Sequence, residues 1–135
     1  MVDEALVKEV LTAEMVQAGK DLTIILDRTQ LAISGSLWLY LPDKGIWRLL
    51  IASELVDSKG PRHVYRKIQS ALRKSSDELG DISLNDISVV SPRTPLISAL
   101  TRILRLPIGG GLRFSKNTVN GQFIEDAYIY KLEKS

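Results

Sequence analysis

The chain has 135 residues, of which 44% are hydrophobic and 25% are charged, and it contains no cysteine. The length is typical of one domain, and the composition is that of a folded globular protein rather than a disordered one. The lack of cysteine excludes disulfides and thiolate zinc sites. We therefore expect a single domain over residues 1–135, stabilised by an apolar core.

The net charge of +2 hides an uneven distribution. Residues 1–60 carry 6 basic and 9 acidic side chains, whereas residues 61–116 carry 10 basic and 4 acidic ones. Residues 117–135 carry 2 basic and 3 acidic side chains. The middle of the chain is therefore predicted to form a positive surface.

Two features of the sequence bear on location. Residues 1–4 include two acids where a secretory signal peptide is basic. Apolar runs stay well short of the roughly 18 residues that a membrane span needs. We expect a cytoplasmic protein without a membrane partner.

The first predicted element is a helix. Residues 3–29 show apolar side chains at steps of three and four, although Gly19 and several β-branched residues favour a strand at residues 22–26 as the alternative. A helix over the whole segment is about 40 Å long. Its first half then overhangs the domain with four apolar residues that need a partner: Leu6, Val7, Val10 and Leu11.

A β-hairpin over residues 36–53 is the clearest local prediction. Residues 37–41 and 46–51 are rich in aliphatic and aromatic side chains, and Pro42-Asp43-Lys44-Gly45 between them is typical of a turn. A three-residue turn at residues 43–45 places Trp47 on the apolar core face and Trp38 on the other face. A two-residue turn shifts this division.

The last predicted strand, residues 122–132, places Tyr128 and Tyr130 on the same side as Asp126. Together with the first hairpin, this strand predicts a sheet face that is amphipathic. We interpret this face in three ways: as a surface covered by another helix, as a protein-contact surface, or as a stacking platform for single-stranded nucleic acid. The predicted interaction face consists of Trp38, Tyr40, Arg48, Asp126, Tyr128 and Tyr130.

The remaining elements follow from turn and capping signals. Pro61 starts a helix to about residue 79, a short strand covers residues 86–91, and Thr94-Pro95 opens a helix to about residue 104. A second hairpin joins residues 112–115 to 122–132. The order α-β-β-α-β-α-β-β predicts an α+β fold with a five-stranded mixed or antiparallel sheet and helices on one or both faces.

No catalytic motif passes a geometric check. Pro42-Asp43 and Asp57-Ser58-Lys59 match the spacing of a metal-dependent nuclease signature, but one extended strand between them separates the acids by roughly 30 Å. His63 is the single histidine and is expected to lie exposed at a helix start. We therefore predict no catalytic residue, no metal site and no cofactor.

Five basic side chains within residues 61–116 are the candidates for phosphate contacts. They are Arg62, Arg66, Arg73, Arg113 and Lys116.

The leading hypothesis is a non-enzymatic protein-interaction or homo-oligomerising module, because the overhanging helix and the aromatic sheet face both call for a partner. The first alternative is a nucleic-acid-binding protein that uses residues 61–116. The second is a small enzyme, expected only if a pocket gathers Arg48, Tyr40, Asp126 or His63 within hydrogen-bonding reach.

Overall fold

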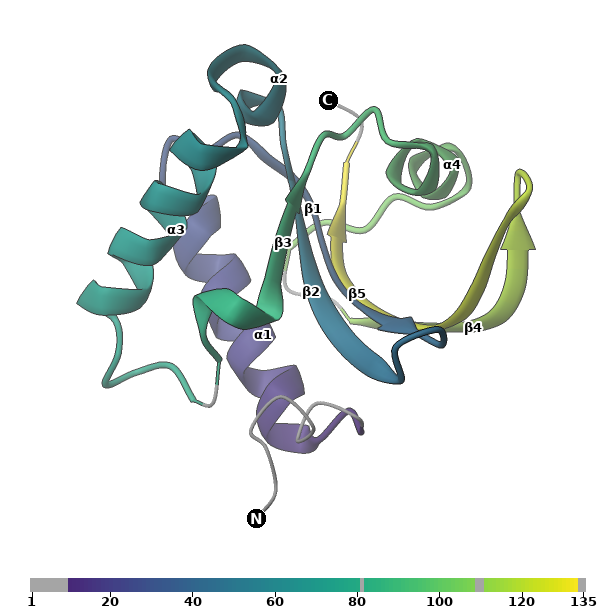
Figure 1. The fold of residues 1–135 in the computed structure, drawn as a ribbon, viewed down its shortest axis with the longest axis horizontal. Coiled ribbons are helices and arrows are strands. Elements are labelled where there is room, and N and C mark those ends of the chain that lie inside the picture. The colour runs from purple at the N-terminus through teal and green to yellow at the C-terminus, as the bar shows by residue number, and fades with distance from the viewer. Residues whose placement is uncertain (1–9, 81, 109–110, 134–135) are drawn as a thin grey trace.

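The computed structural model describes residues 10–80, 82–108 and 111–133. This part of the chain forms four α-helices and a five-stranded mixed sheet, so the α+β prediction is confirmed (Figure 1). The strand order is β3-β2-β1-β5-β4, with β2 and β3 parallel and the other neighbours antiparallel. The elements in chain order are α1 (Ala13–Asp27), β1 (Ile33–Leu41), β2 (Ile46–Ser53), α2 (Leu55–Lys59), α3 (Pro61–Lys74), the 3-10 helix η2 (Leu84–Asp86), β3 (Ile87–Val90), α4 (Pro95–Ile103), β4 (Leu112–Val119) and β5 (Gln122–Leu132).

Helix α1 is shorter than the sequence predicts. The Thr12 hydroxyl accepts a hydrogen bond from the Met15 backbone N–H at 3.1 Å, so Thr12 is the N-cap and the helix begins one residue later. Its 15 residues span about 22 Å. Residues 22–26 are helical, so the strand alternative is wrong. Leu6 and Val7 of the predicted overhang lie outside the described residues, whereas Val10 and Leu11 precede the helix.

The first hairpin is confirmed, but its predicted register is wrong. The turn has four residues rather than three, because the N–H groups of Lys44 and Gly45 both donate to the Leu41 carbonyl and Gly45 has a φ of +65°. Leu41 therefore pairs with Ile46, and Tyr40 pairs with Trp47. Since side chains alternate between the faces of a strand, this shift by one residue places Trp47 on the same face as Trp38.

Helices cover both faces of the sheet (Figure 1). One apolar cluster joins Trp38, Trp47 and Leu49 to residues of α1 and α3, and a second joins Leu37 and Leu39 to α4. Trp38 is completely buried. The sheet face that carries it is therefore the face beneath α1, and the covering-helix interpretation is confirmed for this side chain.

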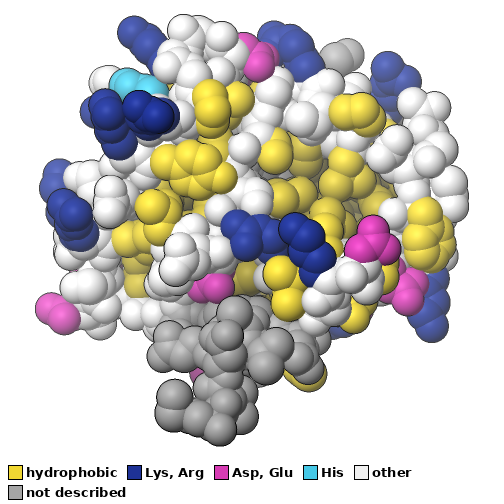
Figure 2. All heavy atoms as spheres, viewed as in Figure 1, with side chains coloured by type: hydrophobic (Ala, Val, Ile, Leu, Met, Phe, Trp, Pro, Cys, Tyr) yellow, Lys and Arg dark blue, Asp and Glu magenta, His cyan; other side chains and the backbone are white. Residues whose placement is uncertain are grey.

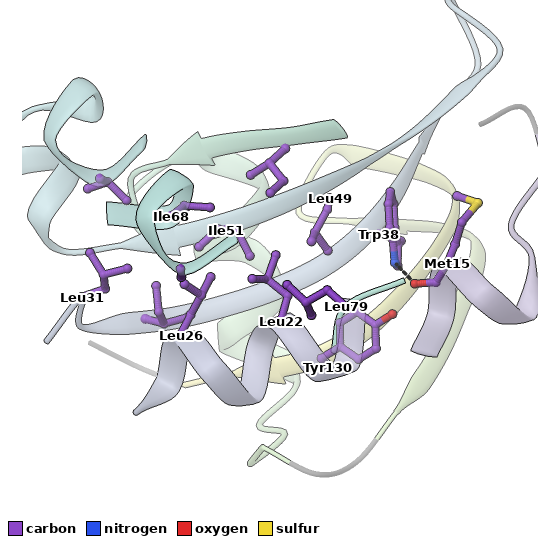
Figure 3. Packing of buried hydrophobic residues seen from close by; sticks show 14 of the residues in the cluster. Met15, Leu22, Leu26, Leu31, Trp38, Leu49, Ile51, Ile68, Leu79 and Tyr130 are labelled. Atoms are coloured by element: carbon purple, nitrogen blue, oxygen red, sulfur yellow. Dashed lines mark hydrogen bonds between the residues drawn. The ribbon is translucent and has the colours of Figure 1, made fainter. Parts of the chain in front are cut away.

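Two polar groups of the sheet make hydrogen bonds to the backbone of α1. Trp38 Nε1 donates to the Met15 carbonyl at 3.1 Å (Figure 3), and the Tyr130 hydroxyl donates to the Val16 carbonyl at 2.6 Å. Burial raises the pKa of Tyr130 above its usual value, which keeps this hydroxyl a donor. The helix approaches the two rings closely because its contact residue is Gly19, which has no side chain.

The later elements follow the predicted order with three differences. Helix α3 ends at Lys74, about five residues before its predicted end. The short helix α2 replaces the expected end of a strand, and Gly60, with a φ of +89°, separates it from α3. Strand β4 continues four residues beyond the prediction, because Asn120 and Gly121 both have positive φ and form a two-residue turn that closes the hairpin. Among the described residues, no helix is both long and apolar enough to cross a bilayer.

Candidate functional site

Helix α3 carries the largest net positive charge of the helices and strands described. Val64, Ile68 and Ala71 are buried and attach it to the core beside α1. The helix contains no Asp or Glu in its 14 residues. Its basic side chains, all exposed, are Arg62, Arg66, Lys67, Arg73 and Lys74.

The outward side of α3 carries four exposed residues, which we name the outer stripe: Arg62, Arg66, Gln69 and Arg73. Their spacing of four, three and four places them in one line along the helix. Within the described ranges, none of these side chains forms a hydrogen bond or an ion pair. The three guanidinium groups therefore face solvent without an internal partner.

A second line of basic residues follows the side of α3 that faces α1 and starts at Lys59, the last residue of α2. We name it the flank: Lys59, His63, Lys67 and Lys74. These residues line a groove of about 590 Å³ between α3 and the C-terminal end of α1, with the buried Leu31 and Ala71 also in its lining. No acidic residue of the described chain lines this groove. Figure 2 shows Lys and Arg side chains gathered around the histidine at this part of the surface.

Three of the five predicted phosphate-contacting residues lie together, namely Arg62, Arg66 and Arg73 on the outer stripe. Arg113 and Lys116 belong instead to β4, at the opposite end of the sheet from α3 (Figure 1). The five residues therefore do not share one surface, because α3 and β4 lie at opposite ends of the sheet.

Arg113 also differs from the outer stripe in having a partner. Its Nε donates to Asp126 Oδ1 at 2.6 Å, and the hydrogen bond from Arg113 lowers the pKa of that carboxyl. The guanidinium also lies over the Trp47 ring, 5.5 Å from its centroid. Arg113 is therefore partly neutralised, whereas the arginines of α3 are not.

The predicted interaction face does not exist as one surface. Trp38 and Tyr130 are 0% and 2% exposed, because α1 lies on them. The shifted register moves Arg48 to the opposite face, where its guanidinium donates to Ser88 Oγ at 2.7 Å and to the Ile87 carbonyl at 2.8 Å. Arg48 thus attaches β3 to β2. Tyr128 is half-buried and packs against Tyr130, with ring centroids 5.3 Å apart.

Two members of that predicted face lie together at the surface. Tyr40 and Asp126 line a shallow hollow of about 420 Å³, together with Trp47 and Arg113. The Tyr40 and Trp47 rings lie 5.4 Å apart at a tilt of 53°. We name these four residues the aromatic hollow.

The structure does not bring together the four residues named for the enzyme alternative. His63 lies in the groove beside α3, Tyr40 and Asp126 lie in the aromatic hollow, and Arg48 is on the opposite face of the sheet. No group of three His, Asp or Glu side chains in the described chain has the arrangement of a metal site. Asp57 of the nuclease-like spacing forms an ion pair with Arg93 instead.

Sequence reasoning identified the arginines of the outer stripe but missed the flank. The spacing of Lys67, Lys74 and His63 was visible, but their groove depends on α1 lying beside α3. Fold and charge together define the class as a mixed α+β domain with one cationic helix on its surface. No protein-family model, curated protein or solved structure matches the chain.

Proposed function

We propose that this protein binds nucleic acid and that α3 is the contact element. The observation that carries the proposal is a surface helix with five Lys or Arg residues and no Asp or Glu, whose outer-stripe arginines have no partner among the described residues. Phosphate groups are the partners that such an array attracts, because each contact releases a counterion condensed on the nucleic acid.

The stability of the domain supplies no reason for this arrangement. Arg62 and Arg66 are four residues apart on α3, and like charges at that spacing destabilise a helix by about 0.2–0.5 kcal/mol per pair. Two exposed arginines elsewhere have acidic partners, Arg93 with Glu54 and Arg113 with Asp126. Three others, Arg28, Arg102 and Arg105, form no ion pair within the described chain. What distinguishes α3 is that its cations lie together on one helix without an acid among them, and an external anion is the partner that we propose for them.

We expect charge reversal on the outer stripe to weaken binding. Fluorescence anisotropy with mixed-sequence 20-mers over a series of salt concentrations measures both affinity and its salt dependence. The double variant Arg66→Glu and Arg73→Glu should reduce the slope of log affinity against log salt by about 2, because two cations that displace counterions from the nucleic acid are lost.

A matched control separates a local site from overall charge. Arg102→Glu and Arg105→Glu change the net charge by the same amount on exposed positions in and just after α4, on the other side of the sheet. This control should retain most of the affinity. Equal loss in both double variants would show attraction to net charge alone, and absence of salt-dependent binding by the wild type would refute the proposal.

A second proposal concerns protein contact through the aromatic hollow. Tyr and Arg are among the residues that most often dominate binding energy at protein interfaces, and Tyr40 and Arg113 line this hollow beside the buried Trp47. We propose this site for self-association.

Self-association has a direct measure. Light scattering at tens of micromolar should then give about twice the chain mass of 15.0 kDa. Tyr40→Glu should return the monomer mass, whereas Lys20→Glu, on an exposed part of α1, should not. A monomeric wild type at these concentrations would exclude self-association.

A further inference from the structure

We infer that α3 enters the major groove of double-stranded DNA and that its outer stripe contacts base edges there. This inference rests on the proposed nucleic-acid binding and specifies its substrate. It separates two roles on one helix, with base contacts from the outer stripe and phosphate contacts from the flank.

The residue types on the two lines differ in a way that fits these roles. The outer stripe contains only Arg and Gln, whose forked groups form paired hydrogen bonds with guanine and adenine edges respectively. The flank contains three Lys and one His. The ammonium group of lysine is a compact charge without a fixed hydrogen-bonding plane, which suits a phosphate.

The dimensions of α3 also fit a major groove. From Arg62 to Arg73 the helix rises about 16 Å, which corresponds to roughly five base-pair steps. An α-helix with its side chains is about 10–12 Å across, and the major groove of B-form DNA is about 12 Å wide. Helix α3 lies at the outer edge of the molecule (Figure 1), and its outer stripe is exposed along its length.

Other nucleic acids fit this surface less well. The major groove of an RNA duplex is deep and too narrow for side chains to read. Single strands bind mainly by stacking bases on open aromatic rings. Trp38 and Tyr130 are buried beneath α1, and the half-buried Tyr65 of α3 accepts a hydrogen bond from the Val89 N–H at 3.0 Å. Tyr65, the ring nearest the outer stripe, is thus held against β3 rather than presented as an open stacking surface.

The helix is held firmly enough to position its side chains. Val64 and Ile68 are completely buried, and the Tyr65–Val89 hydrogen bond joins α3 to β3. Base recognition depends on such support, because a recognition side chain must be presented in one orientation.

Selection from a random 20-base-pair duplex library tests the inference. Wild-type protein should enrich a preferred sequence, which it should bind at least 100-fold more tightly than a scrambled duplex. The triple variant Arg62→Lys, Arg66→Lys and Arg73→Lys preserves charge but not the forked geometry. It should bind the scrambled duplex within about threefold of wild type, while its preference for the selected duplex should fall roughly tenfold or more.

The flank provides the matched control. Lys67→Ala with Lys74→Ala should weaken binding to the selected and scrambled duplexes by the same factor and leave their ratio unchanged. Duplex RNA and single-stranded DNA of the selected sequence should bind at least tenfold more weakly than the DNA duplex.

The outcomes distinguish this inference from the proposed function. Salt-dependent binding with no enriched sequence, or a preference unchanged in the triple Lys variant, would overturn base reading while nucleic-acid binding stands. Equal or tighter binding of duplex RNA or single-stranded DNA would overturn the choice of substrate. No binding to any of these nucleic acids would overturn both.

Discussion

Replacement of Trp38 by alanine should lower the free energy of unfolding by about 3–5 kcal/mol. The side chain is completely buried between the sheet and α1. Its removal leaves a large cavity in the apolar core. It also removes the hydrogen bond from Nε1 to the Met15 carbonyl. Urea unfolding followed by circular dichroism and by the fluorescence of the remaining Trp47 measures the change.

An exposed aromatic residue provides the comparison. Phe123 is 62% exposed on β5, so Phe123→Ala should change the stability by no more than about 0.5 kcal/mol. If Trp38→Ala cost no more than the Phe123 variant, the cover of Trp38 by α1 would be wrong. The same result would restore the open aromatic face that the sequence predicted.

Replacement of Gly19 by alanine should destabilise the protein by about 2 kcal/mol, although alanine is the better helix former by about 1 kcal/mol. A Cβ atom at this position would lie 2.5 Å from Tyr130 Oη and 2.6 Å from Trp38 Nε1. Both contacts are impossibly short, so α1 must move away from the sheet. That movement weakens the hydrogen bonds from the two rings to Met15 and Val16.

Gly80→Ala is the matched substitution for Gly19→Ala. A Cβ atom at Gly80 meets only Ala18 Cβ, at an ordinary 3.7 Å, so this variant should retain its stability within about 0.5 kcal/mol. Urea unfolding of the two variants under the same conditions gives the difference. A Gly19 variant as stable as the wild type would contradict the close packing of α1 on Trp38 and Tyr130.

The two large effects have a common physical origin in the contact between α1 and the sheet. The sequence contains no local signal for this contact. Gly19 looked like a weak point of a helix, whereas in the structure it allows the helix to approach two aromatic rings. The glycine that lowered the helical propensity of the segment therefore has a packing role.

Local chemistry was sufficient to predict most of the elements. The turn residues Pro42–Gly45 predicted the first hairpin, and Thr94-Pro95 predicted the start of α4, which begins at Pro95. The spacing of Arg62, Arg66 and Arg73 predicted one cationic line on a helix. These signals depend on neighbouring residues only, so they can be recognised without a tertiary structure.

The face of the sheet on which each side chain lies, and the ion-pair partner of each arginine, depend on the tertiary structure. One extra residue in the first turn moved Trp47 to the face of Trp38 and moved Arg48 away from it, because side chains on a strand alternate with a period of two. The distant Asp126 neutralises Arg113, whereas nothing in the described chain neutralises Arg62, Arg66 or Arg73. Local sequence is enough to place the charges and the turns along the chain. Only the packing of α1 and the pairing of the strands decided which side chains are buried and which are left for a partner.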